Sequence, residues 1–363
     1  MNRLPIELIK IIIEYDEKSI IKLTSLDKIL YSHRKYLRID IDYNNINNLK
    51  TSFQINYLYN VDDLPLLMNI NKEFLGIKFS DNFNKIVHDL PKNITNLIFG
   101  SDFNQTIDGL LQNITHLTFG DCFDQNVDDL PKKLTNLIFG ACFDQKVNKL
   151  SRNIIHLTFG CYFNQNVDDL PQNITHLTFG CRFNQSVDNL PQNITHLKFG
   201  DDFNQNVDNL PKNISYLTFG GDFNQTIDDL PKNIIKLTLS NYFNQNVDNL
   251  PINITHLTFG NYFNKNVNNL PKKITYLTFG RDFNQKVDNL PNEITHLTFG
   301  YYFNQNVDNL PKKITYLAFG GYFNQKVDNL PKGITHLTFG YYFNRNVDNL
   351  PKNITYLDFW KRF

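Results

Sequence analysis

The chain is built from one 20-residue unit that repeats fourteen times between Asp81 and Trp360, without insertion or deletion. A representative copy is residues 201–220, DDFNQNVDNLPKNISYLTFG, and the next copy starts in the same register at Gly221. A unit this short cannot bury a core alone, so neighbouring units must shield each other's apolar side chains. The repeat therefore predicts a solenoid of stacked coils, and we number the positions of each coil from 1 to 20.

Apolar side chains recur at positions 3, 7, 10, 14, 17 and 19 of the unit. In the representative copy they are Phe203, Val207, Leu210, Ile214, Leu217 and Phe219. A continuous helix is excluded because it could not hold both Pro211 and Gly220 of the representative unit without breaking. Alternation of apolar and polar residues predicts a strand over 214–220. Identical strands stacked at about 4.8 Å would form a parallel sheet.

The other positions are typical of turns and of a phenylalanine core. Glycine occupies position 20 in twelve copies, where we expect it to free the backbone to turn. The run Asp208-Asn209-Leu210-Pro211 predicts the opposite corner. Phenylalanine fills all fourteen position 3 sites and thirteen position 19 sites, which predicts two buried columns. Position 4 is asparagine in twelve copies and aspartate in Asp124 and Asp144, so we expect an inward ladder that bonds the backbone of the next coil.

The chain divides into four segments: residues 1–40, 41–80, 81–360 and 361–363. Residues 1–40 predict short amphipathic helices, the first opened by Pro5 and carrying Leu8, Ile11, Ile12 and Tyr15 at helical spacing. Residues 41–80 predict one or two decayed coils that join these helices to the array. Residues 361–363 are a short tail after Trp360, whose ring we expect to cover the last coil.

Charge and composition exclude several classes of function. Lys plus Arg equals Asp plus Glu at 36 each, which argues against nucleic-acid or anionic-membrane binding through bulk charge. The apolar run 11–13 is too short for a membrane span and no signal peptide is apparent, so we expect an intracellular protein with free thiols at its cysteines. A zinc site is disfavoured because Cys122, Cys142, Cys161 and Cys181 are spread over four coils.

Two stretches carry a resemblance to known families. The segment LPIELIKIIIEYDEKSIIKLTSLDKIL resembles an F-box, and the 20-residue unit resembles the FNIP repeat, a relative of leucine-rich repeats. Together they are similar to the F-box and FNIP repeat-containing proteins of giant amoebal viruses. The resemblance implies a mainly β, leucine-rich-repeat-like solenoid with a small helical F-box-like segment, acting in the host cytoplasm.

The resemblance also implies an adaptor role. F-boxes dock on a Skp-type subunit of a cullin-RING ubiquitin ligase while the attached repeats hold a target protein. The residues that match the docking pattern are Leu4, Pro5, Leu8, Ile11 and Ile12. The alternative is a protein-binding or structural rod without a ligase link, in which the N-terminal helices only cap the solenoid.

Aromatic side chains suggest where a target would bind. Position 16 points outward from the predicted strand and holds histidine in seven copies (His116, His156, His176, His196, His256, His296 and His336) and tyrosine in four (Tyr216, Tyr276, Tyr316 and Tyr356). Such a stripe suits a protein or peptide, but it could equally be a ladder that stabilises the sheet. Metal binding by His156, His176 and His196 is a weaker alternative.

Tyrosines also gather after the strand in the C-terminal half, at Tyr242, Tyr262, Tyr301, Tyr302, Tyr322, Tyr341 and Tyr342. We therefore expect partner binding at that end, through His256, Tyr276, His296, Tyr316, His336 and Tyr356 together with Tyr302, Tyr322 and Tyr342. No phosphate-binding loop, nucleophile elbow or zinc-protease motif is present. We expect no catalytic residue, no metal and no cofactor.

Overall fold

The computed structural model describes residues 38–42, 54–62, 74–87 and 90–360. The predicted helices over residues 1–37 and the tail 361–363 lie outside these ranges. The chain divides into two compact units, Met1–Phe143 and Asp144–Phe363. Every strand in both is paired in parallel with its neighbours of the same unit.

The first unit contributes six described strands. They are β1 (Arg38–Asp42), β2 (Gln54–Val61), β3 (Phe74–Phe79), β4 (Asn96–Ile98), β5 (His116–Thr118) and β6 (Asn136–Ile138). The strand β1 crosses the boundary that the sequence placed at residue 40. In the transition segment, β3 pairs with β4 so that Ile77 lies opposite Leu97, the position 17 residue of the first coil.

The second unit contributes eleven strands, one from each of its coils. They are β7 (His156–Thr158), β8 (His176–Thr178), β9 (His196–Lys198), β10 (Tyr216–Thr218), β11 (Lys236–Thr238), β12 (His256–Thr258), β13 (Tyr276–Thr278), β14 (His296–Thr298), β15 (Tyr316–Ala318), β16 (His336–Phe339) and β17 (Tyr356–Phe359). Most are three residues long, shorter than the seven-residue strand predicted. Each residue pairs with the same position of the next coil, as Leu197 does with Leu217. The parallel solenoid predicted from the repeat is thus confirmed.

The six apolar columns form the core. Between Phe103 and Phe339, side chains at positions 3, 7, 10, 14, 17 and 19 are 0 to 7% exposed. Phenylalanine rings stack within and between coils: the Phe199 and Phe203 centroids are 3.8 Å apart, and those of Phe199 and Phe219 are 5.6 Å apart. The two predicted phenylalanine columns are therefore confirmed as the core.

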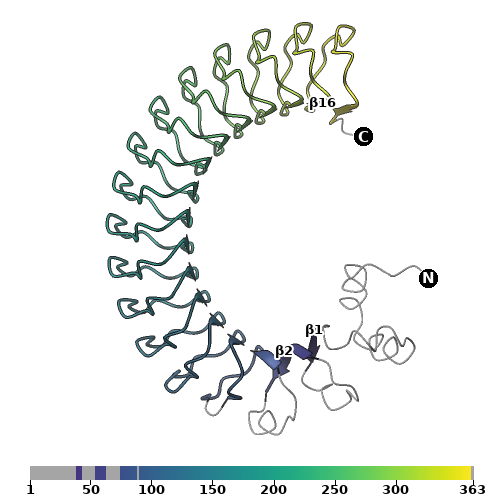
Figure 1. The fold of residues 1–363 in the computed structure, drawn as a ribbon. Coiled ribbons are helices and arrows are strands. Elements are labelled where there is room, and N and C mark those ends of the chain that lie inside the picture. The colour runs from purple at the N-terminus through teal and green to yellow at the C-terminus, as the bar shows by residue number, and fades with distance from the viewer. Residues whose placement is uncertain (1–37, 43–53, 63–73, 88–89, 361–363) are drawn as a thin grey trace, which may run out of the picture. The chain divides into compact units, whose positions relative to one another are not determined.

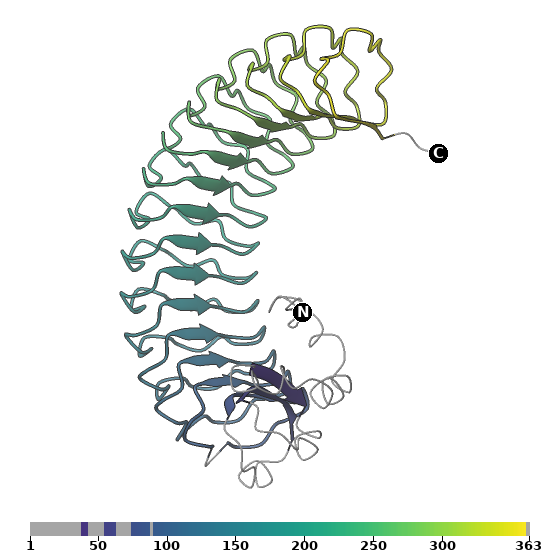
Figure 2. The same ribbon diagram turned by 45° about the vertical axis from the view of Figure 1, so that its right-hand side comes forward.

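The second unit is curved, and its strands follow the inner, concave side (Figures 1 and 2). Backbone hydrogen bonds hold neighbouring strands about 4.8 Å apart. The ring centroids of His176 and His196, on the strand face, are 4.1 Å apart. The ring centroids of Phe203 and Phe223, in the interior, are 6.0 Å apart. The coils therefore fan apart on the side of the phenylalanines, which places the outward face of the strands on the concave surface.

The glycines at position 20 allow neighbouring coils to approach closely, and they do not serve the turn that was predicted. Among the described glycines only Gly109 has a positive φ, of 85°. A Cβ atom on Gly220 would lie 2.0 Å from the carbonyl oxygen of Gly200, and the same clash recurs along the column. The prediction that glycine frees the backbone to turn was wrong, because glycine is needed here for close contact between coils.

Trp360 in the last coil and Ser240 are the two position 20 residues other than glycine, and of these Ser240 is buried. Its hydroxyl donates to the carbonyl oxygen of Phe223 at 2.5 Å and accepts from the backbone N–H of Phe243 at 3.0 Å. The residue before it is Leu239, the one non-aromatic residue at position 19 of the array. A polar side chain is thus buried here with both hydrogen-bonding roles satisfied.

The amide ladder at position 4 bonds the backbone of the next coil as predicted. Asn204 Oδ1 accepts from the backbone N–H of Asn224 at 2.9 Å and from Nε2 of Gln225 at 3.1 Å. Asp144 does the same for the N–H of Asn164 at 2.8 Å. The expected inward orientation was wrong, because the position 4 residues are half-buried or exposed. The ladder runs along the surface, where a short polar side chain still reaches one coil further.

Candidate functional site

The outward residues of the strands form an aromatic surface in the second unit. We call it the histidine–tyrosine stripe; its members are His156, His176, His196, Tyr216, His256, Tyr276, His296, Tyr316, His336 and Tyr356. Position 17 leucine points into the core, so positions 16 and 18 face the opposite way. The orientation predicted for position 16 is therefore confirmed: these residues are half-buried or exposed on the concave face.

Neighbouring rings of the stripe lie face to face. The centroid distances are 4.3 Å for His196 and Tyr216 and 4.4 Å for His256 and Tyr276. They widen to between 5.7 and 6.2 Å from His296 to Tyr356. Offset stacking at these distances stabilises the rings mutually and leaves their edges facing solvent. The stripe is therefore both a ladder within the sheet and an accessible surface.

Lys236 divides the stripe into two stacks. It occupies position 16 on β11, between Tyr216 on β10 and His256 on β12. The first stack runs from His156 to Tyr216 and the second from His256 to Tyr356. The sequence interpretation did not single out this lysine, although its substitution at a histidine or tyrosine position is visible in the repeat.

A hydroxyl fixes the orientation of six of the seven histidine rings at position 16; the seventh, His156, follows Ile155. The Oγ1 atom of the preceding threonine lies 2.8 to 2.9 Å from Nδ1 in six copies: His116, His176, His196, His256, His296 and His336. The same threonine oxygen also reaches the position 15 carbonyl of the preceding coil, as Thr195 does to Thr175 at 3.2 Å. Because Nδ1 is occupied, Nε2 is the nitrogen available to a partner.

Four histidines in the stacks favour the neutral form. Burial lowers the pKa of His176 from its ordinary value, and the neighbouring His196 and His156 lower it further. Burial also lowers the pKa of His256, with smaller contributions from Lys236 and His296. The pKa values of His196 and His296 shift in the same direction, chiefly through burial. At neutral pH these four histidines therefore favour the uncharged form.

A second aromatic surface follows position 20. We call it the tyrosine band; it comprises Tyr242, Tyr262, Tyr301, Tyr302, Tyr322, Tyr341 and Tyr342 at positions 1 and 2 of their coils. Tyr302, Tyr322 and Tyr342, which were predicted with the stripe, lie in this separate column. Tyr322 contacts both Tyr302, at 5.3 Å between centroids, and Tyr342, at 4.6 Å.

The predicted adaptor residues Leu4, Pro5, Leu8, Ile11 and Ile12 lie outside the described residues. All four cysteines are free thiols. Cys161 forms a side-chain hydrogen bond with Cys181 that, together with burial, raises the pKa of Cys181. In the described part of the chain, no three His, Cys, Asp or Glu side chains come together as a metal site. The same residues include no helix long and apolar enough to cross a bilayer.

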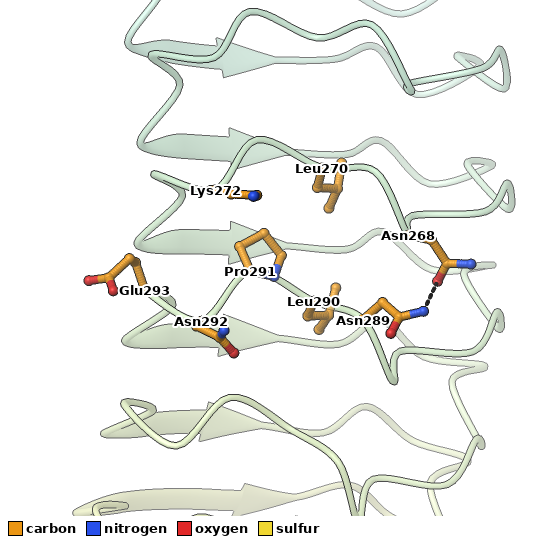
Figure 3. Close-up of a pocket in the computed structure, with 8 residues that line it drawn as sticks. All are labelled: Asn268, Leu270, Lys272, Asn289, Leu290, Pro291, Asn292 and Glu293. Atoms are coloured by element: carbon orange, nitrogen blue, oxygen red, sulfur yellow. Dashed lines mark hydrogen bonds between the residues drawn. The ribbon is translucent and has the colours of Figure 1, made fainter.

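A hollow of about 360 Å³ lies away from both aromatic surfaces, between the coils that contain Leu270 and Leu290 (Figure 3). Its lining residues are Asn268, Leu270, Lys272, Asn289, Leu290, Pro291, Asn292 and Glu293. Asn289 Nδ2 donates to Asn268 Oδ1 at 3.3 Å across it. Glu293 is already paired with Lys313, 2.6 Å away. The hollow therefore offers amides and one lysine, without a cluster suited to acid–base chemistry.

These features define a leucine-rich-repeat-like β-solenoid of the kind that serves as a protein-interaction scaffold. The FNIP Repeat family matches residues 82–122, 143–181, 183–222, 203–242, 223–262, 243–282, 266–302, 283–322 and 323–361. The chain belongs to the FNIP repeat family. Among curated proteins, none matches the sequence significantly.

Two solved structures resemble this fold. CroV588, from a giant virus and described as a novel circular LRR protein, is 38% identical with a TM-score of 0.72. The match covers 89% of this chain, which spans 56% of the length of CroV588. YopM from Yersinia enterocolitica is 16% identical with a TM-score of 0.55, and the match covers 85% of this chain and 67% of YopM. The YopM likeness concerns the fold alone.

Proposed function

We propose that this protein binds a target protein on the concave face of its second unit, through the histidine–tyrosine stripe. The observation that carries the proposal is the run of stacked and accessible aromatic rings from His256 to Tyr356. Aromatic side chains give large contact areas at a small cost in conformational entropy, and they dominate the energetics of protein interfaces. The concave face of a solenoid adds an extended surface.

The test compares the full chain with a variant carrying Tyr316→Ala, His336→Ala and Tyr356→Ala. We expect the variant to retain its thermal midpoint and to lose most of the captured target, identified by quantitative proteomics of retained host proteins. A matched control replaces the exposed Lys312, Lys332 and Lys352 by Ala, away from the stripe. Equal capture by both variants would refute binding through the stripe, and insolubility of the first variant alone would favour a purely structural ladder.

We further propose that residues 1–40 connect this binding face to a Skp-type adaptor of a cullin-RING ubiquitin ligase in the host cytoplasm. The support is the F-box-like pattern at Leu4, Pro5, Leu8, Ile11 and Ile12. Leu8→Glu with Ile12→Glu should abolish co-purification of the adaptor, whereas Lys10→Glu should not. If the adaptor is never recovered with the full chain, a binding or structural rod without a ligase link is the better interpretation.

A further inference from the structure

The tyrosine band carries a second inference, which is independent of binding to the stripe. Its rings form a series of contacts over six coils, with one interval that an arginine fills. Tyr242 stacks on Tyr262 at 4.9 Å, and Tyr302 meets Tyr301 and Tyr322 at 5.0 and 5.3 Å. At the far end Tyr342 contacts Tyr341 at 4.7 Å.

Every member of the band is open to solvent. The exposed fractions of the seven tyrosines lie between 39 and 53%. Gly321 contributes to this packing, because a Cβ atom there would lie 2.3 Å from Cε2 of the Tyr301 ring. Soluble proteins seldom expose a contiguous aromatic patch of this extent unless a partner covers it.

The gap in the band shows which chemical group its rings accept. Arg281 fills the interval between Tyr262 and Tyr302, with Cζ 5.3 and 6.0 Å from the two ring centroids. Its Nε also donates to Asp282 Oδ1 at 2.9 Å. A guanidinium over a tyrosine face is attracted by the negative electrostatic potential above the ring.

A second arginine, in an earlier coil, makes a similar contact with a tyrosine at position 2. The guanidinium of Arg182 lies 4.3 Å from the centroid of Tyr162, one coil earlier at the same position. Two separate tyrosines in this column thus hold a guanidinium supplied by the next coil. Between these arginines the same positions hold the exposed carboxylates Asp201, Asp202 and Asp222, and Asp222 lies one coil before Tyr242.

We propose that the tyrosine band binds an arginine-bearing segment of a partner protein. The chain's own Arg281 occupies one interval, and the rings of Tyr242, Tyr341 and Tyr342 receive further guanidinium groups. Arginine is preferred over lysine because its planar group stacks on a ring while its N–H groups still donate to a carboxylate, as Arg281 does to Asp282. Asp222 supplies that acceptor near the start of the band.

The test measures binding of a fluorescent peptide with three arginines spaced by glycine and serine to the full chain. Peptides with three lysines or three glutamines are the matched probes. A variant with Tyr302→Leu, Tyr322→Leu and Tyr342→Leu removes the ring charge distribution but keeps apolar side chains. We expect its dissociation constant for the arginine peptide to rise about tenfold, and the corresponding Tyr→Phe variant to stay within about twofold.

Two further variants test whether the arginine peptide binds to the tyrosine band or to the histidine–tyrosine stripe. Arg281→Gln vacates an interval and removes a like charge, so it should strengthen binding of the arginine peptide. Tyr276→Leu with Tyr316→Leu alters only the stripe and should leave this binding unchanged. If the triple leucine variant fails to fold, the phenylalanine and Arg281→Gln variants still test whether the band binds arginine. Equal affinity for the glutamine peptide, or weaker binding by Arg281→Gln, would overturn the proposal.

Discussion

Thr195 Oγ1 lies 2.9 Å from Nδ1 of His196 and so holds the imidazole in one orientation. Thr195→Val keeps the shape of the side chain but removes this partner and the bond to the Thr175 carbonyl oxygen. We expect the free energy of unfolding to fall by about 1 kcal/mol and the ring nitrogen NMR shifts of His196 to change. Thr195→Ser is the control, since Ser215 makes the same bond to a preceding carbonyl oxygen at 3.2 Å. An unchanged His196 signal in the valine variant would contradict this role.

Adjacent glycines provide a sharp test of how closely the coils approach. A Cβ on Gly220 would lie 2.0 Å from the Gly200 carbonyl oxygen, whereas a Cβ on Gly221 would meet its nearest atom at 3.5 Å. Gly220→Ala should therefore lower the free energy of unfolding by about 3 kcal/mol, and Gly221→Ala should change it little. Urea denaturation of both variants measures the difference. Equal stability would show that the coils shift apart without cost.

The repeat by itself determines most of the fold. Six apolar positions in twenty, a proline corner and a glycine corner admit a parallel solenoid and exclude a helical one. The reason for the glycine could not be derived from the sequence, because it depends on the distance between backbones of neighbouring coils. The curvature also escaped prediction, since it follows from the unequal spacing of the phenylalanine and histidine rings.

The candidate surfaces were predictable in part. The outward direction of position 16 follows from strand alternation around leucine, so the stripe could be found from the sequence. The separation of Tyr302, Tyr322 and Tyr342 from that stripe could not, because it depends on where the chain turns after position 20. The stacking of Arg281 on Tyr262 likewise needs the lateral distance between coils. From the sequence, only the 20-residue period indicated that Arg281 and Tyr262 lie in neighbouring coils.

The surface amide ladder can be tested at Asn204. Asn204→Ala leaves the backbone N–H of Asn224 without its acceptor, so we expect a loss of about 1 to 2 kcal/mol in the free energy of unfolding. Asn204→Asp retains an oxygen at this place and should lose clearly less, as Asp144 accepts from Asn164 in the same way. Chemical denaturation of the two variants measures the effect. A smaller loss for alanine than for aspartate would rule out the ladder bond as the stabilising contact.

We expect the positive charge of Lys236 to lower the pKa of His256. The ammonium group is one of the causes that lower the pKa of His256, second to burial. Lys236→Gln should therefore raise this pKa, and Lys236→Arg should not, as it keeps the charge. NMR titration of the imidazole signals gives the result directly, with His196 as an internal reference in the other stack. A His256 pKa that stays fixed in the glutamine variant would mean that Lys236 does not contribute and that burial and His296 lower it.

The stacked histidines should make stability depend on pH. The pKa values of His176, His196, His256 and His296 are lowered by burial from an ordinary value of 6.5. Above this pH both the folded and unfolded states hold neutral rings. As the pH falls below it, the unfolded chain takes up protons first, so the free energy of unfolding decreases until the folded rings are protonated too.

Denaturation curves between about pH 8 and pH 5 would measure this loss, since carboxylates add their own dependence only at lower pH. A variant with His176→Gln, His196→Gln, His256→Gln and His296→Gln should show a flatter dependence through the same window. The matched control replaces His116, whose position 16 neighbours on β4 and β6 are asparagines, and should keep the slope of the unaltered chain. If the fourfold variant also retains that slope, acid sensitivity arises outside the stacks and the neutral stripe is not what stabilises the fold.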